Sequence, residues 1–429
     1  MTPFDFSGSE SPFLDASRPF ALRGATVVDP FAETASRRDL FVVNGILVDA
    51  SEFRGGAEYD AEGLAVLPVL SDLHVHARDD ILAAGTHGGF GSLVTMANNT
   101  PPIDNVDAVR AIAATRHPSV RLLPAACVTR GRAGREVVDM EDLVRLGGAV
   151  AFTDDGTMVA DDGVMREAMS RAAALGVPVM DHAMVPALMG RGVVRDCPAA
   201  RAGGWPVVPP ETETEAVARD IALSRETGCA VHLQHISCAG SVELIRAARS
   251  EGLRVSGEAT PHHLLLCAED IPGDDANWKM NPPLGTRADR DAVRAGVLDG
   301  TLSVLATDHA PHPAAAKARG FREAPFGIVG LETALGASYE ALVVESGMNL
   351  AEFVRRWTVG PGEVVPSCRA DGPEFLCPGR KAPAFLVADF ATRRPVDPSR
   401  FHGGATNSPF AGRRLPCVHG GLLRYGAGM

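Results

Sequence analysis

Short apolar runs alternate with amphipathic stretches through the middle of the chain. Eight such runs are LPVLSDLHVH (67–76), SLVTMAN (92–98), VRLLPAACV (120–128), GAVAFTDD (148–155), VPVMDH (177–182), CAVHLQH (229–235), LRVSGEAT (253–260) and LSVLATDH (302–309). Runs of this length are typical of buried parallel strands. Strand, helix and strand repeated about eight times predict a (β/α)8 barrel. An open doubly wound sheet is the alternative, but no glycine-rich nucleotide-binding motif follows any run.

The stretches between the runs have helical spacing. From Asp162 to Leu175, apolar side chains recur three and four positions apart, and charged residues fall elsewhere around the helix. The ranges 211–228 and 239–252 have the same pattern, and each ends at a Gly that can supply a left-handed C-cap. The sequence therefore predicts helices over these three ranges.

Both ends of the chain have the patterning of a small sheet. The runs are FALRGATVV (20–28), DLFVVNGILV (39–48) and AEGLAVL (61–67) at one end, and APAFLVADF (382–390) and LPCVHGGLLRYG (415–426) at the other. We expect residues 1–66 and 371–429 to form one small β-sandwich domain, and residues 67–370 to form the barrel.

Composition excludes several classes of protein. The formal net charge of -12 argues against a nucleic-acid binder, which needs a basic face. No apolar run approaches the ~20 residues of a membrane helix, and the N-terminus has no signal-peptide pattern. The eight cysteines form no C-x-x-C pair, which favours reduced thiols over disulfides or a zinc ribbon. We therefore expect a cytoplasmic protein that acts on a small molecule.

Most of the predicted strands end in groups that bind metal ions or move protons. They are Asp72, His74 and His76 in the first run, Asp154 and Asp155 in the fourth, His182 in the fifth, His235 in the sixth and Asp308 in the eighth. Each group alone is common in turns or cores, but the carboxyl ends of barrel strands meet at one face. Four imidazoles and two carboxylates are too many for one catalytic zinc and fit two ions that share a carboxylate. Zn²⁺ suits this mixture best, and Mn²⁺ and Co²⁺ remain open.

The strand-end motifs resemble those of the bacterial zinc dihydroorotases, a type I branch of the amidohydrolase superfamily. They are DLHVHAR (72–78), MANNTPPID (96–104), AFTDDG (151–156), HISCAGSVELIRAA (235–248), EATPHHLLL (258–266), KMNPPL (279–284), ATDHAPH (306–312) and APFGIVGLETA (324–334). The resemblance implies a barrel enzyme that reversibly hydrolyses (S)-dihydroorotate to N-carbamoyl-L-aspartate in pyrimidine biosynthesis.

The same resemblance assigns the metal ligands. It implies that His74, His76 and Asp308 hold one Zn²⁺, that His182 and His235 hold a second, and that Asp155 bridges the two. Other branches use a carbamylated lysine as the bridge, but AFTDDG contains no lysine. Asp154 remains the alternative to Asp155. Two cations lower the pKa of a bound water to about 7 and supply a hydroxide, and Asp308 then serves as the catalytic general acid and base.

Substrate recognition calls for a group that binds a carboxylate. Arg78 lies two residues beyond His76 on the same strand face and carries a guanidinium, which binds carboxylates with two hydrogen bonds. A salt bridge at the barrel mouth is the alternative role for Arg78. The resemblance also assigns Asn98, Asn281 and His312 to the substrate, with backbone contacts from Phe326 and Gly327. Residues 313–325 have the composition of a mobile closing loop.

The segment after Arg78 departs from the family pattern. Asp79 and Asp80 lead to the next strand about ten residues sooner than in relatives, so we expect a short first helix. Two other functions stay open: another cyclic-amide hydrolase, such as an allantoinase or hydantoinase, and an inactive scaffold subunit of aspartate transcarbamoylase. Arg78 and Asn98 count against the first, and the complete ligand set counts against the second. For partners, we expect a homodimer, and association with aspartate transcarbamoylase remains open.

Overall fold

The computed structural model describes residues 2–3, 14–369 and 376–420. Its centre is a sheet of eight parallel strands: β7 (Leu70–Val75), β8 (Phe90–Thr95), β9 (Arg121–Ala126), β10 (Ala151–Phe152), β11 (Val179–Asp181), β12 (Val231–Leu233), β13 (Val255–Ala259) and β14 (Val304–Leu305). Each strand pairs with its neighbour in chain order. The barrel closes where the His76 N–H donates to the His309 carbonyl at 2.9 Å. The predicted (β/α)8 barrel is therefore confirmed, and each of the eight runs overlaps one barrel strand.

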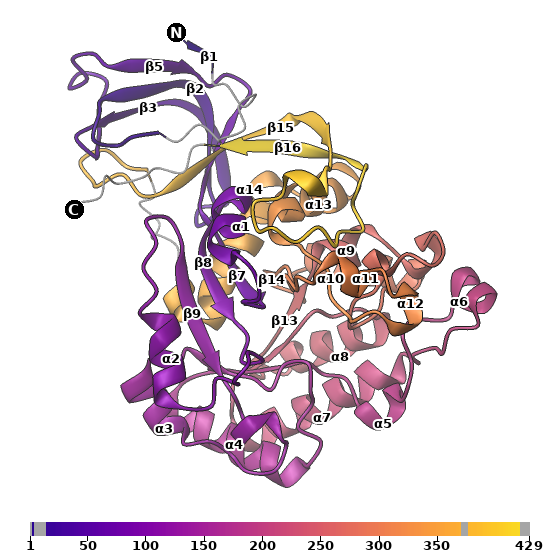
Figure 1. The fold of residues 1–429 in the computed structure, drawn as a ribbon. Helices are drawn as coiled ribbons and strands as arrows, with labels where there is room; N and C mark the ends of the chain where they lie inside the picture. The colour runs from indigo at the N-terminus through magenta and orange to yellow at the C-terminus, as the bar shows by residue number, and fades with distance from the viewer. Residues whose placement is uncertain (1, 4–13, 370–375, 421–429) are drawn as a thin grey trace.

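Helices surround the barrel, both between successive strands and after the last strand (Figure 1). They are α1 (Ile81–Gly88), α2 (Val106–Ala113), α3 (Met140–Asp142), α4 (Asp162–Leu175), α5 (Pro186–Met189), α6 (Pro198–Gly203), α7 (Glu211–Thr227), α8 (Ala239–Ser250), α9 (Pro261–Leu265), α10 (Arg287–Leu298), α11 (Ala314–Lys317), α12 (Gly320–Glu323), α13 (Ala334–Tyr339), α14 (Leu350–Trp357) and α15 (Val359–Val364). Within the described part of the chain, none of the helices has the length and apolar character needed to cross a membrane.

The three helices predicted from spacing are confirmed. Helix α4 begins after Asp161, whose side chain accepts a hydrogen bond from the Val164 N–H, and ends at Gly176 in the left-handed conformation. Gly228 ends α7 in the same way, whereas α8 ends two residues before Gly252. Helix α1 has only eight residues, as expected from the shortened segment after Arg78.

A second, mixed sheet is built from both ends of the chain (Figure 1). Its strands are β1 (Thr2–Pro3), β2 (Phe20–Asp29), β3 (Thr34–Val43), β4 (Ile46–Val48), β5 (Ala57–Asp60), β6 (Ala65–Pro68), β15 (Phe385–Pro395) and β16 (Arg414–Gly420). The two ends meet where β15 pairs antiparallel with β6. Helix α14 connects this sheet to the barrel, because Arg355 Nη1 donates to the Pro30 carbonyl at 3.4 Å. The predicted domain limits stay a prediction, and residues 421–426 of the last predicted run lie outside the described residues.

Residues 313–325 form the segment expected to be a mobile closing loop. They contain α11 and α12, and the Lys317 side chain is 6% exposed. Lys317 Nζ donates to the carbonyls of Lys279, Pro325 and Gly327 at 3.2, 3.1 and 2.8 Å. One buried lysine side chain therefore joins the segment to the barrel, and the expected mobility stays a prediction.

Candidate metal centre and active site

Three predicted ligands meet between the first and last barrel strands. His74 lies on β7, His76 follows it, and Asp308 follows β14. Asp308 Oδ1 lies 3.0 Å from His76 Nε2 and 3.4 Å from His74 Nε2. The ligand atoms of the three buried residues all lie within 4.8 Å of one another. The structure thus brings together the side chains predicted to hold the first ion.

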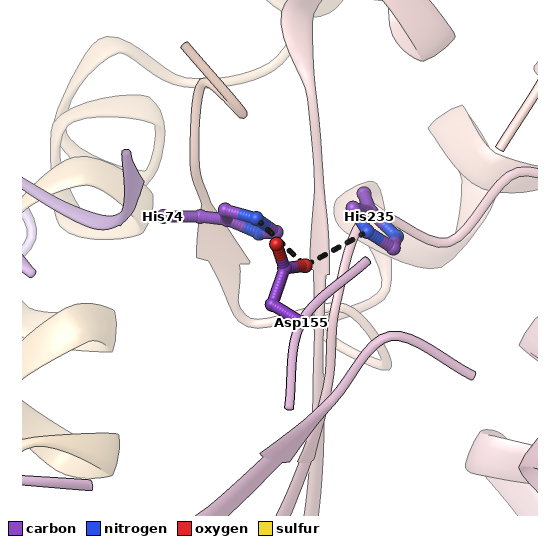
Figure 2. Close-up of side chains that lie close together, drawn as sticks. All are labelled: His74, Asp155 and His235. Atoms are coloured by element: carbon purple, nitrogen blue, oxygen red, sulfur yellow. Dashed lines mark ion pairs between the residues drawn. The ribbon is translucent and has the colours of Figure 1, made fainter. Parts of the chain in front are cut away.

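The second group lies on the neighbouring side of the barrel mouth. His182 follows β11 and His235 follows β12, and His182 Nδ1 lies 2.8 Å from His235 Nε2. Asp155 Oδ1 lies 3.3 Å from His74 Nε2, 3.6 Å from His182 Nδ1 and 4.0 Å from His235 Nε2. Figure 2 shows the Asp155 carboxylate between the rings of His74 and His235. One carboxylate therefore faces both groups, as a bridging ligand must.

Asp154 has different partners from Asp155. Asp154 Oδ1 accepts from the backbone N–H groups of Val128 and Thr129 at 2.9 and 3.2 Å, and its Oδ2 accepts from the Thr129 hydroxyl. Asp154 therefore holds the segment after β9, and these bonds use both of its oxygens. The geometry favours Asp155 over Asp154 as the bridging ligand.

The buried nitrogen atoms fit a divalent ion. His74 Nε2 is buried and has no hydrogen-bond partner among the described residues, although two carboxylates lie nearby. Burial lowers the pKa of His235, and His182 and His74 lower it further, so its ring is neutral, the form that binds metal. Neutral imidazoles and carboxylates are the ligands that Zn²⁺ and related ions prefer.

The carboxylates supply the negative charge that such ions require. Burial opposes the charged form of Asp155, but the charges of His74, His76 and His182 outweigh burial and hold its pKa well below the usual range. Burial also opposes protonation of His74, yet Asp155 and Asp308 outweigh it and raise the pKa of His74. The site therefore attracts positive charge at His74, which is where the predicted ion would replace the proton.

A cavity of about 150 Å³ lies over the two groups. Arg78, Asn98, Asn281, Phe326 and Gly327, all predicted to contact substrate, line this cavity. They surround the same space that Asp155 and Asp308 face. A small molecule in the cavity would meet the ligand cluster on one side and a guanidinium on another.

His312 takes a less direct position. Its Nε2 donates to the Phe326 carbonyl at 2.7 Å, and Arg78 Nη1 lies 3.4 Å from the same nitrogen. Burial lowers the pKa of His312 to about 4, and the nearby charge of Arg78 acts in the same direction. His312 is therefore neutral at pH 7 and holds the Phe326 backbone beside the cavity.

Comparison with known proteins identifies the family. A family model described as "Dihydro-orotase-like" matches residues 63–241. A dihydroorotase of Geobacillus thermodenitrificans is 43% identical over 378 residues, covering 85% of this chain and 86% of the relative. A dihydroorotase of Pelotomaculum thermopropionicum is 39% identical over 408 residues, covering 92% and 94%. The chain belongs to the dihydroorotase family.

Solved structures support the same fold. The chain resembles a dihydropyrimidinase from Brevibacillus agri with a TM-score of 0.75 and 22% identity, covering 93% of this chain and 92% of the other. An L-hydantoinase from Arthrobacter aurescens gives a TM-score of 0.76 and 24% identity, covering 93% of both chains. At these identities the likeness concerns the fold, while the sequence relatives place the chain among the dihydroorotases.

Two residues predicted for dihydroorotate binding also touch the predicted ligands. Asn98 Oδ1 lies 2.8 Å from His76 Nδ1, and Asn98 Nδ2 donates to Asp155 Oδ2 at 3.1 Å. Asn281 Nδ2 lies 2.8 Å from His182 Nε2. In this dihydroorotase-family structure, both amides therefore orient ligand side chains from the cavity side.

Glu258 is a site residue that the sequence interpretation missed. It is completely buried at the carboxyl end of β13, with Oε1 2.9 Å from His74 Nδ1 and Oε2 3.0 Å from His232 Nε2. Burial raises the pKa of Glu258, but hydrogen bonds from His232 and His74 outweigh it and lower the pKa to about 2. The signal was available, because Glu258 ends the run LRVSGEAT just as the predicted ligands end theirs.

Arg132 was also missed, and the sequence offered no signal for it. It lies in the segment after β9 with a positive φ of 55°. Its Nη2 donates to the carbonyl of Asp155 and, at 3.2 Å, to the Thr157 hydroxyl. Arg132 therefore holds the turn that presents the Asp155 carboxylate, a role that only the folded chain reveals.

Proposed function

We propose that this chain is a metal-dependent dihydroorotase that interconverts (S)-dihydroorotate and N-carbamoyl-L-aspartate. The observation that carries this proposal is a buried cluster of four imidazoles and two carboxylates beside a cavity that Arg78 lines. The high coverage by relatives named dihydroorotase supports the same reaction. We propose two Zn²⁺ per chain: one held by His74, His76 and Asp308, and one by His182 and His235, with Asp155 shared.

Bound ions would supply Lewis acidity, activating water and polarising the ring carbonyl. Side chains of the protein would transfer the protons. Asp308 faces the cavity, and its Oδ1 is placed to take a proton from the attacking water and to give it to the departing ring nitrogen. Ring opening therefore yields one new ureido N–H and one carboxylic acid, which releases the second proton of the water to solvent and becomes a carboxylate. The reverse order of the same transfers closes the ring, the direction that we propose for pyrimidine synthesis.

Arg78 explains the choice of substrate. Dihydroorotate carries a carboxylate on its ring, and a guanidinium at the cavity wall can bind that group with two parallel hydrogen bonds. Hydantoin and allantoin lack this carboxylate and would leave Arg78 without its partner. The complete ligand cluster argues against the inactive scaffold. Assembly as a homodimer, and association with aspartate transcarbamoylase, remain predictions that light scattering of the protein with and without that enzyme would test.

A direct experiment tests the proposed function. The purified protein is analysed for bound metal by mass spectrometry and assayed for hydrolysis of dihydroorotate, allantoin and hydantoin under the same conditions. We expect about two zinc ions per chain and a clear preference for dihydroorotate. Protein that binds no metal and hydrolyses none of the three would contradict the proposal. If hydantoin or allantoin were hydrolysed faster than dihydroorotate, that compound would be identified as the substrate.

A further inference from the structure

Glu258 lies between the two groups of predicted ligands and touches both. Its Oε1 receives the Nδ1–H of His74 at 2.9 Å and the backbone N–H of His235 at 3.1 Å. In the proposed function these residues hold different ions. One buried oxygen atom thus contacts a ligand residue of each ion.

The contact with His74 selects which ring nitrogen can bind metal. A carboxylate can only accept hydrogen bonds, so a contact at Nδ1 places the ring proton there. The opposite nitrogen, Nε2, is then the one that can bind an ion, and it faces Asp155 Oδ1 at 3.3 Å and Asp308 Oδ1 at 3.4 Å. Glu258 therefore fixes the tautomer in which His74 presents Nε2 to the centre of the cluster.

The contact with His235 fixes a backbone rather than a ring. His235 has a φ of 36°, a left-handed conformation that costs energy in a residue with a side chain. The bond from its N–H to Glu258 Oε1 holds the residue there, with its ring 2.8 Å from His182 Nδ1. The same oxygen thus helps to hold His235, one member of the second imidazole pair, in place.

The other carboxylate oxygen of Glu258, Oε2, contacts a further histidine. His232 Nε2 lies 3.0 Å from Oε2, and His232 Nδ1 lies 2.8 Å from Ser256 Oγ. Other buried carboxylates near the strand ends have different hydrogen-bond partners. Asp154 and Glu213 accept from backbone N–H groups and a hydroxyl, and neither has a hydrogen bond to an imidazole in the described structure.

We propose that Glu258 is a positioning residue shared by both ions of the centre. The inference rests on the proposed metal-dependent function and adds that the two ion sites depend on one carboxylate. Loss of that carboxylate weakens both sites together. Outer groups that orient metal ligands typically contribute 10- to 100-fold to metal affinity, so an effect of about that size is expected at each site.

The test compares Glu258→Gln with Glu213→Gln, a matched change at a carboxylate that is also buried. Metal-free wild type and both variants are titrated with Zn²⁺ against a chromophoric chelator, which gives two stepwise dissociation constants. We expect Glu258→Gln to weaken both steps about 10- to 100-fold, and Glu213→Gln to stay near wild type. An amide cannot accept from His74 and His232 at once, which is why the isosteric change suffices.

A second measurement needs no variant and decides the matter if Glu258→Gln fails to fold. In the zinc-loaded wild-type protein labelled with ¹⁵N-histidine, NMR should find the His74 proton on Nδ1 and none on Nε2. A proton on Nε2, or weakening confined to one of the two zinc steps, would overturn the shared role of Glu258. A wild-type protein that binds no zinc would instead overturn the proposed function on which the inference rests.

Discussion

Two of the predicted ligands have a backbone conformation that residues with side chains rarely adopt. His235 has a φ of 36° and Asp308 a φ of 48°. Such conformations cost about 1–3 kcal/mol each and persist only where surrounding contacts impose them. Here the His235 N–H is bound by Glu258, and the residue after Asp308 donates its N–H to Thr307 Oγ1 at 3.1 Å. Single residues at the strand ends are therefore held in place at the expense of local stability.

Substitutions of the adjacent residues Asp154 and Asp155 should have different effects, one on stability and the other on metal binding. Asp155→Asn removes the charge that faces both ligand groups, so we expect zinc affinity to fall by more than about 100-fold with loss of activity. Asp154→Asn weakens the bonds to Val128 and Thr129 and should cost about 1–3 kcal/mol of stability while zinc stays bound. Metal analysis and urea unfolding of both variants check this. If only the Asp154→Asn variant lost zinc, Asp154 would be the bridging ligand and Asp155 would be the residue that contributes to stability.

Arg78→Ala should remove substrate recognition without removing metal. Loss of a two-point, charged hydrogen-bonding contact should lower kcat/KM for dihydroorotate roughly 100- to 1,000-fold, because the ring carboxylate loses its partner. Arg130→Ala is the control, since Arg130 is exposed and forms an ion pair with Glu136 away from the cavity lining. Steady-state kinetics and zinc content are measured for both. An Arg78→Ala enzyme with unchanged kcat/KM would leave Arg78 as a salt-bridge residue of the barrel mouth.

At the scale of elements, the sequence pattern predicted the helices and strands whose formation depends on residues close to one another in sequence. The eight apolar runs each contain a barrel strand because parallel strands are buried on both faces. Helix α4 was predicted with its observed bounds because its apolar residues recur at helical spacing from Asp162 to Leu175, and in the structure Asp161 and Gly176 cap it. The polar strand β5 (AEYD) was missed because none of its residues is buried. Alternation there gives no apolar signal.

A strand irregularity shows what pattern alone could not predict. Between the pairs Asp72–Leu93 and Val75–Thr95, β7 has one residue more than β8. Leu73 packs with the buried cluster that includes Val94, while the next residue, His74, faces the metal site. A bulge of this kind redirects side chains beside active sites. Glu258, Arg132 and the bulge depend on contacts between strands, which a single sequence does not contain.

The segment from α11 to Gly327 should loosen when Lys317 is replaced. Lys317→Met removes the donor shared by three carbonyls and should cost about 1–3 kcal/mol, with faster hydrogen exchange over residues 313–327. KM should rise more than kcat falls, because Phe326 and Gly327 line the cavity but are not among the predicted metal ligands. Lys381→Met, the same change on an exposed residue of the other sheet region, is the control. Unchanged hydrogen exchange in Lys317→Met would contradict this anchoring.

Lys317 also predicts a dependence of stability on pH. Burial lowers its pKa to about 7 from an ordinary value of 10.5, and the charge of Lys279 acts in the same direction. Between these two values the unfolded chain binds a proton that the folded chain has lost, so the Lys317 contribution to stability rises with pH. Urea unfolding at pH 7 and pH 9 should show this rise in wild type and a smaller one in Lys317→Met. An equal rise in the free energy of unfolding between pH 7 and pH 9 in both proteins would refute this prediction.

On the scale of the whole molecule, the site depends on a segment that follows the barrel in the chain. Asn407, from the segment between β15 and β16, is buried against the loop that follows β14. Its Nδ2 donates to the carbonyls of Ala310 and Gly327, both at 3.1 Å, and its Oδ1 accepts from the His312 N–H at 3.2 Å. The C-terminal region therefore supports the cavity wall as well as the mixed sheet.

Metal binding should consequently stabilise the whole fold. The ligands come from five barrel strands that are far apart in sequence, so ions bound to them favour only the folded chain. Free zinc at 100 times the dissociation constant would contribute about 3 kcal/mol per site. Thermal unfolding of chelator-treated protein should occur at a lower temperature and recover on adding zinc. In Asp155→Asn the gain should be much smaller, because the shared charge is absent. If zinc stabilised both proteins equally, the stabilising ion would have to bind outside this cluster.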